Sequence, residues 1–405
     1  MAGTTVQTLH SGKQIFRCFS SVKTLSFRRN WSRKCHLRLL PIGFPKTEPL
    51  VSVRQICFKH GITVHAATSF DNSTVMRIVV GTVLPKRGLE LLEEWSRTRD
   101  DCELWVWPHE EQIPRDTLLK EVSGAHYLLI SLRERVDIEL LEAAGPQLRA
   151  ISTFSVGFDH VDVAACKEKG IIVGNTPGVL TETTADTAFA LLMATARRVP
   201  EAVDAVKSGA WSDWRPEWMC GKDVHSSTIG IIGLGRIGLA FARRASGFGC
   251  RILYSGRSRK LEAENELLSR GCREVLFVSQ NDLLEQSDFV VPMCSLNEET
   301  RGMFNSEIFE KMKNDAIFVN ITRGGVVNQD DLYDALSRGI IRAAGLDVTT
   351  PEPLPPQDKL LTLANCVVFP HIGSASFETR QRMSELAVEN ILQAAGGKEV
   401  QNKVV

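Results

Sequence analysis

Three polar residues in the last third of the chain, Arg323, Glu352 and His371, have types that could do chemistry together. Each lies just beyond an apolar, strand-like run, namely 316–321, 343–348 and 366–370. The carboxyl ends of parallel strands meet at one edge of a sheet. There a guanidinium, a carboxylate and an imidazole can bind an organic acid, orient the imidazole and supply a proton. The alternative is three unrelated polar residues in exposed loops.

A glycine pattern earlier in the chain predicts a dinucleotide site. The apolar run 228–232 leads directly into Gly233, Gly235 and Gly238, and a helical pattern follows. Gly233 permits a tight turn, Gly235 lets the backbone approach a pyrophosphate, and Gly238 lets the helix pack closely on its strand. The alternative is a merely structural turn, but the strand before the glycines and the helix after them favour nucleotide binding.

The end of the next apolar run, 250–254, predicts which dinucleotide is bound. An acidic residue at this place would accept a hydrogen bond from the ribose 2′-OH of NAD. The chain instead has Ser255, Gly256, Arg257, Ser258 and Arg259. Guanidinium and hydroxyl groups bind a 2′-phosphate through charge-assisted hydrogen bonds, and no carboxylate repels it. We therefore expect NADPH as the preferred cofactor and NADH as the second choice, with a solvated basic turn as the alternative.

The composition excludes several classes of protein. Residues 1–75 contain eleven Lys/Arg and two Asp/Glu, so the remaining residues, with 37 basic and 46 acidic side chains, are net acidic. We therefore expect no nucleic-acid partner. No apolar run is long enough to span a bilayer, so no membrane partner is expected. The ten cysteines form no CxxC pair, which favours reduced thiols over a disulfide framework and predicts no metal site.

Residues 1–75 differ from the rest of the chain. They are poor in acids, lack sustained strand or helix periodicity, and carry arginines at 17, 28, 29, 33 and 38. This composition is typical of a mitochondrial transit segment. The alternative is a disordered extension before a folded part that starts at Met76. We expect a cytoplasmic location for the folded part, with mitochondrial targeting by residues 1–75 as the other possibility.

From Met76 the pattern alternates between strands and helices, over 78–80, 89–95, 103–106, 117–122, 127–130, 138–144, 150–153, 161–167 and 171–173. This alternation predicts an α/β fold with two doubly wound parallel-sheet lobes. A long helix over 181–199, capped by Thr181, and a later helix over 376–392 are also expected. We predict a substrate domain at 76–177, flavodoxin-like and discontinuous, a Rossmann nucleotide domain at 178–362, and a return to the substrate domain at 363–405.

Five ordered motifs carry a resemblance to a known family: 155–160 (SVGFDH), 233–238 (GLGRIG), 320–325 (NITRGG), 347–353 (DVTTPEP) and 370–374 (PHIGS). Together they resemble the D-isomer-specific 2-hydroxyacid dehydrogenase family, and within it the reductases of glyoxylate and hydroxypyruvate. The resemblance covers essentially all of 76–405. It implies an oxidoreductase in which His371 gives a proton to the substrate oxygen while the nicotinamide gives hydride to the carbonyl carbon.

The resemblance also implies the other site residues. Glu352 would orient His371 and favour its protonated ring. Arg323 would bind the carboxylate and carbonyl of a small 2-oxo acid. Backbone N–H groups of Val156 and Gly157, together with Ser374, complete the expected substrate site. Further cofactor contacts are implied at Arg236, Ile237, Ser295, Ile321, Asp347 and Gly373. For Ile321 and Ser295 the alternative is an ordinary core residue and a simple turn residue.

Other conspicuous side chains are expected to have no chemical role. His109, His126 and His225 have no partnered motif, and His160 is expected to support its loop. Three tryptophans lie in one irregular segment, at 211, 214 and 218. Members of the resembled family dimerise through the nucleotide domain. We therefore expect a homodimer in which this segment reaches the partner, with an intramolecular anchor as the alternative.

Two classes of function remain open. The first is an NADPH-dependent reductase of glyoxylate, to glycolate, and of hydroxypyruvate, to D-glycerate. The alternatives are a nucleotide-sensing, corepressor-like protein of the same fold or another D-2-hydroxyacid dehydrogenase. The absent ribose carboxylate and the absence of a long regulatory tail favour the reductase.

Overall fold

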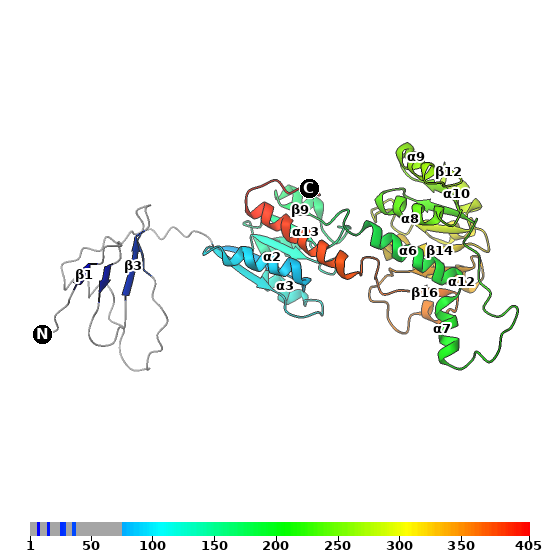
Figure 1. Cartoon of the computed structure of the whole chain (residues 1–405), viewed down its shortest axis with the longest axis horizontal. Coiled ribbons are helices and arrows are strands. Elements are labelled where there is room, and N and C mark those ends of the chain that lie inside the picture. Colours follow the sequence, from blue (N-terminus) through cyan, green and yellow to red (C-terminus); the bar gives the residue numbers. More distant parts are fainter. Residues whose placement is uncertain (1–5, 9–13, 17–24, 30–34, 38–74) are drawn as a thin grey trace. The chain divides into compact units, whose positions relative to one another are not determined.

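The computed structural model describes residues 75–405 and, before them, four short strands: β1 (Val6–Thr8), β2 (Gln14–Phe16), β3 (Leu25–Arg29) and β4 (Cys35–Leu37). These strands pair in antiparallel fashion in the order β1-β2-β3-β4 (Figure 1). The sequence predicted no strands here, although β1, β2 and β3 contain β-branched or aromatic residues that favour them locally. The rest of the predicted leader, including its disorder or targeting role, lies outside the described residues.

The first of two parallel sheets in residues 75–405 has five strands. They are β5 (Met76–Val80), β6 (Cys102–Val106), β7 (Tyr127–Ile130), β8 (Ala150–Thr153) and β9 (Ile172–Gly174), and the order is β6-β5-β7-β8-β9. The helices between them are α2 (Lys86–Arg97), α3 (Arg115–Glu121), α4 (Ile138–Ala144) and α5 (Val163–Glu168). In chain order the strands run 2-1-3-4-5, which is the flavodoxin-like arrangement that the sequence predicted.

The second parallel sheet has seven strands. They are β10 (Thr228–Ile232), β11 (Arg251–Ser255), β12 (Val275–Phe277), β13 (Phe289–Pro292), β14 (Ile317–Asn320), β15 (Ala343–Leu346) and β16 (Cys366–Val368). Their order is β12-β11-β10-β13-β14-β15-β16, a Rossmann arrangement that reverses between β10 and β13. The helices are α6 (Thr181–Ala196), α7 (Val199–Lys207), α8 (Arg236–Ser246), α9 (Leu261–Ser269), α10 (Gln280–Gln286), α11 (Ser306–Glu310) and α12 (Gln329–Ser337), with 3₁₀ turns η1 (Gly324–Val326) and η2 (Lys359–Thr362).

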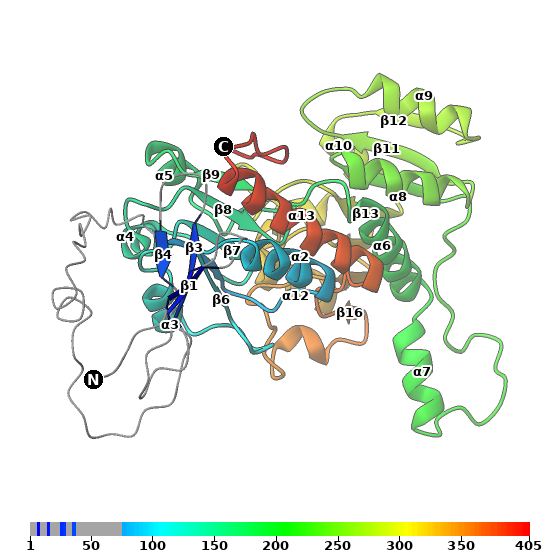
Figure 2. The ribbon, with the colours of Figure 1, turned by 60° about the vertical axis from the view of Figure 1, so that its left-hand side comes forward.

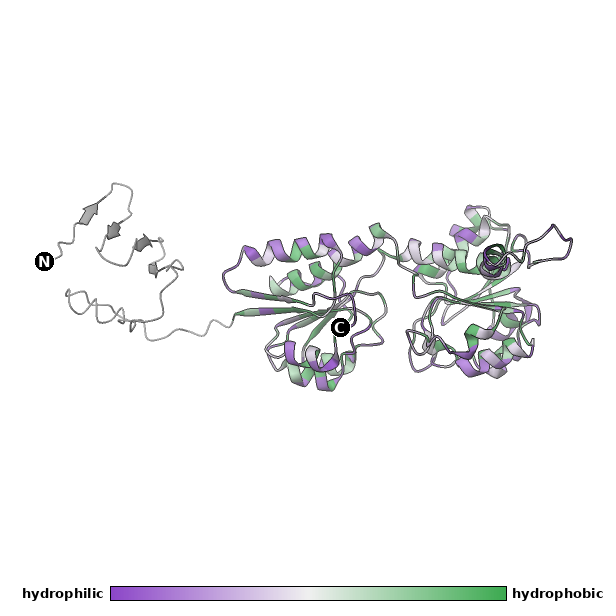
Figure 3. Cartoon of the chain, turned by 90° about the horizontal axis from the view of Figure 1, so that it is seen from below, coloured by the Kyte–Doolittle hydropathy of each residue, from purple (hydrophilic) through white to green (hydrophobic). Residues whose placement is uncertain are grey.

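The central strands of both sheets are buried on both faces. In β7, β8, β14 and β15 every residue is buried, as expected for parallel strands covered by helices on each side. Figure 3 shows the hydrophobic colour concentrated along the strands and the hydrophilic colour on the outward sides of the helices. The two-lobed α/β fold predicted from the alternating pattern is therefore confirmed.

The last helix, α13 (Phe377–Ala395), returns to the first sheet. It packs against α2, β7 and β8, and Figures 1 and 2 both show it running beside α2. The residues after α13 also join this lobe: Val404 N donates to Val173 O at 2.7 Å, and Val173 N donates to Val405 O at 3.1 Å. The first lobe is therefore discontinuous in sequence, and its last helix begins at the Ser376 cap.

Two details differ from the predicted boundaries. β16 pairs with β15 in the seven-stranded sheet. The chain therefore returns to the first lobe after β16, and not at 362/363. The long helix α6 has Leu180, not Thr181, at its N-cap and ends at Ala196, because the chain turns there through Arg198, whose φ of 54° is left-handed. Within residues 75–405 no helix combines the length and apolar character needed to cross a membrane.

Candidate active site

The three residues singled out in the sequence lie beyond the carboxyl ends of three neighbouring strands. Arg323 follows β14, Glu352 follows β15 and His371 follows β16. Because β14, β15 and β16 are adjacent and parallel, their carboxyl ends bring the three loops to one edge of the sheet. All three side chains therefore lie at the carboxyl edge of the sheet, as the sequence predicts.

Glu352 and His371 form a direct hydrogen bond. Nδ1 of His371 lies 2.8 Å from Oε2 of Glu352, and Oε1 of Glu352 accepts from the backbone N–H of Thr349 at 3.0 Å. Burial alone would raise the pKa of Glu352, but the hydrogen bond and charge of His371 outweigh it and hold the pKa below its ordinary value. An ionised Glu352 fixes the orientation of the imidazole and leaves Nε2 for a reacting group.

The backbone at His371 is strained. Its φ of 53° is in the left-handed region that non-glycine residues seldom adopt, and its N–H donates to the carbonyl oxygen of Asp347 at 2.9 Å. Asp347 is 1% exposed and accepts from the N–H groups of Ile372 and Gly373, each at 2.8 Å. Burial raises the pKa of Asp347 above its ordinary value. The buried Asp347 carboxylate thus holds the loop that carries His371.

Arg323 is oriented by a residue from the other lobe. Its Nε donates to Oδ1 of Asp159 at 2.9 Å, and its Nη1 donates to the carbonyl oxygen of Thr322 at 3.0 Å. Asp159 lies in the SVGFDH motif, but no pattern in the sequence pairs it with Arg323. The pair leaves Nη2 of Arg323 beside Gly157, where a Cβ would lie 1.9 Å from that nitrogen.

The loop at 155–157 presents backbone N–H groups. Oγ of Ser155 donates to the Gly157 carbonyl at 2.6 Å, and Nδ2 of Asn175 donates to the Val156 carbonyl at 2.8 Å. Within residues 75–405 the N–H groups of Val156 and Gly157 donate to no protein acceptor. Such a loop can hold a carboxylate between these N–H groups and Arg323.

A cavity of about 390 Å³ joins these groups. Of the predicted substrate and cofactor residues, it is lined by Val156, Gly157, Arg236, Ile237, Ser295, Ile321, Arg323, Asp347, His371, Gly373 and Ser374. Arg380, from the first turns of α13, also lines it and was missed because a helical arginine has no distinguishing sequence pattern. Glu352 touches the cavity only through His371, as an orienting group would.

The glycine fingerprint has the geometry that a pyrophosphate needs. Gly233 has a φ of 103°, and a Cβ on Gly238 would lie 2.4 Å from the Gly233 carbonyl oxygen. A Cβ on Gly235 would meet nothing within 4 Å, so the space beside this backbone is open where α8 begins. The open backbone and the helix N-terminus fit a dinucleotide phosphate, at the point where the strand order reverses.

The two arginines of the basic loop after β11 differ in their contacts. Gly256, Arg257 and Ser258 are exposed, and Arg257 forms no ion pair within the described part of the chain. Arg259 is different, because its Nη2 lies 2.8 Å from Oε2 of Glu264. From the sequence, both arginines are expected to be available to an anion. In the structure, Arg259 is already paired with Glu264.

The buried His160 and the three tryptophans differ in their contacts. Nε2 of His160 lies 2.9 Å from Oγ1 of Thr153, and burial lowers the pKa of His160 to about 4, so its ring is neutral and supports the loop. The guanidinium of Arg215 covers the ring of Trp218 at 4.2 Å, whereas Trp211 and Trp214 are 59% and 77% exposed.

The fold and the cavity define a nicotinamide-dependent dehydrogenase with a Rossmann lobe and a second α/β lobe. Residues 189–373 match the model of the D-isomer-specific 2-hydroxyacid dehydrogenase, NAD-binding domain. The chain is 51% and 50% identical over 324 residues to the mouse and human glyoxylate reductase/hydroxypyruvate reductases, covering 80% of this chain and 96% of each relative. It belongs to the D-isomer-specific 2-hydroxyacid dehydrogenase family.

A solved relative adds a nucleotide to the comparison. The NADPH-dependent glyoxylate/hydroxypyruvate reductase from Sinorhizobium meliloti, crystallised with NADP and malonate, has a TM-score of 0.69 and 30% identity. The match covers 82% of this chain and 97% of that one.

Proposed function

We propose that this enzyme is an NADPH-dependent reductase that converts glyoxylate to glycolate and hydroxypyruvate to D-glycerate. The observation that carries the proposal is the 2.8 Å contact between Nδ1 of His371 and Glu352, at a cavity that Arg323 also lines. The mouse and human relatives, which are named glyoxylate reductase/hydroxypyruvate reductase, are 51% and 50% identical to 80% of this chain, and they support the choice of substrates.

The side chains have distinct roles in the proposed reaction. Arg323 and the N–H groups of Val156 and Gly157 bind the carboxylate, and Arg323 also stabilises negative charge on the carbonyl oxygen. His371 donates the proton from Nε2 to that oxygen, while Glu352 keeps the ring oriented through Nδ1. The nicotinamide supplies hydride when bound.

Fit to the cofactor comes from the open space beside Gly235 and from the basic loop. Gly233, Gly235, Arg236, Ile237 and Gly238 would hold the pyrophosphate. The 2′-phosphate would meet Gly256, Arg257, Ser258 and Arg259, while Ser295, Ile321, Asp347 and Gly373, which line the cavity, would contact the nicotinamide side. No acidic side chain lies between Ser255 and Lys260, which favours NADPH over NADH.

A panel of glyoxylate, hydroxypyruvate and pyruvate, each assayed with NADPH and with NADH, tests the proposal directly. We expect turnover of the first two substrates and a higher kcat/KM with NADPH. The absence of turnover for every pair would favour a nucleotide-sensing binding protein instead. An Arg257→Ala, Arg259→Ala variant should raise the KM for NADPH far more than that for NADH, and equal changes would reject the assigned 2′-phosphate site.

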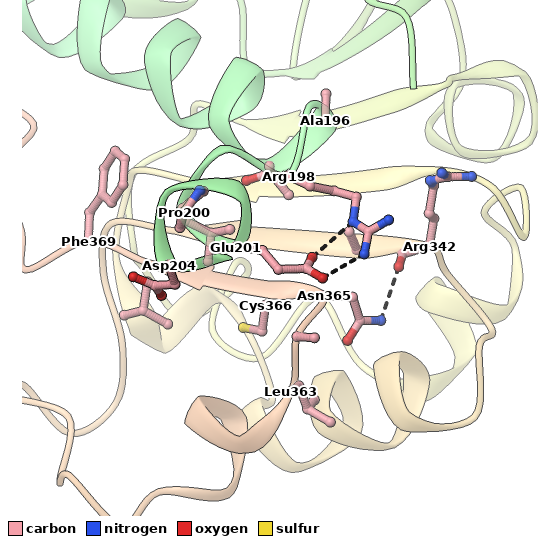
Figure 4. Close-up of a pocket in the computed structure, with 15 residues that line it drawn as sticks. Ala196, Arg198, Pro200, Glu201, Asp204, Arg342, Leu363, Asn365, Cys366 and Phe369 are labelled. Atoms are coloured by element: carbon pink, nitrogen blue, oxygen red, sulfur yellow. Dashed lines mark hydrogen bonds and ion pairs between the residues drawn. The ribbon is translucent and has the colours of Figure 1, made fainter. Parts of the chain in front are cut away.

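We further infer a homodimer formed through the nucleotide lobe. Helix α7 exposes Val199, Val203 and Val206, one helical face that finds no cover in the monomer. Figure 4 shows the neighbouring groove, where Arg198 pairs with Glu201 beside the loop and edge strand that contain Asn365 and Cys366. Substitution of Val203 and Val206 by Lys should give a monomer in light scattering; a persistent dimer would contradict this interface.

The contact of Trp218 with Arg215 favours its role as an internal anchor, and the two exposed tryptophans are better candidates for reaching the partner. A Trp214→Ala variant that keeps both the dimer and the substrate kinetics would exclude this residue from the interface.

For the compartment, we propose that residues 76–405 act in the cytoplasm, with a mitochondrial address in residues 1–75 as the alternative. The cysteines at 102, 166, 220, 250, 272, 294 and 366 are all free thiols, which favours a reducing compartment. Imaging of residues 1–75 fused to a fluorescent protein decides between the two, because a diffuse signal would reject the address.

A further inference from the structure

A buried carboxylate lies next to the basic loop and has no part in the proposed chemistry. Glu264 belongs to the first turn of α9, and its side chain is 6% exposed. Its Oε1 accepts from Oη of Tyr254 at 2.6 Å and from Nε of Arg259 at 2.9 Å. Its Oε2 accepts from Nη2 of Arg259 at 2.8 Å. A carboxylate with so little exposed surface needs hydrogen-bond partners of this kind.

Tyr254 connects this carboxylate to the strand that carries the loop. It is the fourth residue of β11, is 1% exposed, and its Oη also accepts from the backbone N–H of Lys260 at 2.7 Å. The hydroxyl therefore holds the far end of the loop and donates to Glu264 at the same time. Both ends of the segment 255–260 are fixed through one phenol.

The ion pair is oriented with its carboxylate inward and its guanidinium outward. The side chain of Arg259 is 58% exposed, against 6% for Glu264. The Nε and Nη2 edge of Arg259 faces the carboxylate, and within the described residues Nη1 has no acceptor. A bidentate arginine held along one edge still offers donors on the other side to an anion.

Arg257 provides the contrast within the same loop. It is exposed and has no hydrogen bond or ion pair from its guanidinium within residues 75–405. Binding a phosphate would require this side chain to be ordered, whereas Arg259 is already ordered. Ordering of a free arginine opposes binding through lost rotamer entropy.

We propose that Glu264 and Tyr254 are positioning residues that hold Arg259 ready for the 2′-phosphate of NADPH, and thereby strengthen the preference for NADPH over NADH. The inference rests on the proposed use of NADPH. The same ion pair could act in the opposite direction. If Glu264 competed with the 2′-phosphate for Arg259 and repelled the phosphate, it would weaken NADPH binding, and removal of its charge would strengthen NADPH binding. The inward position of the Glu264 carboxylate favours the first effect.

The test uses 2′,5′-ADP, which carries the 2′-phosphate, and 5′-AMP, which lacks it, titrated by calorimetry into the full-length protein. Glu264→Gln should weaken 2′,5′-ADP about three- to tenfold, the effect of freeing one arginine side chain, and leave 5′-AMP unchanged. Glu262→Gln is the matched control, since Glu262 is exposed in the same helical turn and should change neither affinity.

A double-mutant cycle shows whether the effect passes through Arg259. In an Arg259→Ala background, Glu264→Gln should have no further effect on 2′,5′-ADP. Tyr254→Phe serves as the second variant if Glu264→Gln does not fold, and it should weaken 2′,5′-ADP in the same direction and by less. Steady-state KM values for NADPH and NADH should follow the same pattern.

The outcomes separate this inference from the proposed function. Tighter or unchanged 2′,5′-ADP binding by Glu264→Gln, in a protein that still prefers 2′,5′-ADP to 5′-AMP, overturns the inference alone. An unmodified protein that binds the two nucleotides equally overturns the proposed NADPH preference and the inference with it.

Discussion

Nε of Arg323 donates to Oδ1 of Asp159 at 2.9 Å, although the two residues are 164 positions apart in the sequence. Arg323 follows a strand of the seven-stranded sheet, and Asp159 follows a strand of the five-stranded sheet. Both side chains are partly exposed, at 22% and 26%, so water screens the attraction and the pair contributes little to stability. Its consequence is geometric, because it fixes the plane of the guanidinium.

Asp159→Asn should therefore impair catalysis more than folding. The amide keeps the shape but loses the charge that holds Nε, so the KM for glyoxylate should rise about two- to fivefold with little change in the melting temperature. Steady-state kinetics and a thermal melt measure the two effects. A KM equal to that of the unmodified enzyme would show that Arg323 is positioned without Asp159.

Gly157→Ala should strongly reduce the activity of the enzyme without unfolding it. The new Cβ would lie 1.9 Å from Nη2 of Arg323, and the guanidinium would have to leave its place beside the loop. Misplacement of a substrate-binding group by about 1 Å can cost on the order of 100-fold in rate, so we expect a loss of kcat/KM of that size. Titration of the nucleotide should give an unchanged affinity; full activity would remove Gly157 from the site.

His371→Ala and Arg323→Ala should differ in kinetic signature. Loss of the general acid should lower kcat by about 10²- to 10⁴-fold with a small effect on KM. Loss of Arg323 removes a contact made both to bound substrate and to the developing oxyanion, so KM should rise and kcat should fall. Similar KM values for the two variants would argue against separate roles.

Glu352→Gln should move the pH dependence of reduction toward acid. The carboxylate is ionised, since His371 holds its pKa below the ordinary value despite the burial that raises it. A neutral amide no longer favours the protonated imidazole, so the acid form needed for reduction is lost at lower pH. The measurement is kcat/KM against pH; a shift toward alkali would contradict the role given to Glu352.

His160 should make the fold less stable in acid. Burial lowers its pKa from 6.5 to about 4, so between these values the unfolded chain binds a proton that the folded chain does not. Above pH 6.5 the ring is neutral in both states, so His160 has no effect on the free energy of unfolding. As the pH falls from 6.5 to 4, the difference in proton binding lowers the free energy of unfolding by about 1.4 kcal/mol per pH unit. Urea unfolding of His160→Gln should show a shallower decline over that range, and an identical decline would assign the acid sensitivity to other groups.

Much of the fold and of the catalytic trio could be predicted because the signals are local. Apolar runs and glycine spacing indicate parallel strands, and the end of a parallel strand places a residue at a known edge. Arg323, Glu352 and His371 follow three strands that are neighbours both in the chain and in the sheet, so chain order and spatial order coincide.

Contacts between distant segments could not be predicted in the same way. Asp159 and Arg323 pair across the two lobes, and no periodicity in either segment specifies that contact. Glu264 was missed for a related reason: in sequence it is one of several acids in α9, and only the fold shows that it is buried beneath Arg259. The predicted domain boundary at 362/363 separates the run 366–370 from its sheet, since β16 pairs with β15.

The position of α13 against α2, β7 and β8 has a consequence for how the chain is made. The five-stranded sheet is synthesised before the seven-stranded sheet, but α13, which packs on β7 and β8, is synthesised after the seven-stranded sheet. Domains generally fold as units during synthesis. On the ribosome, the nucleotide lobe can therefore complete its core first, whereas β7 and β8 lack their contact with α13 until the whole nucleotide lobe has been synthesised.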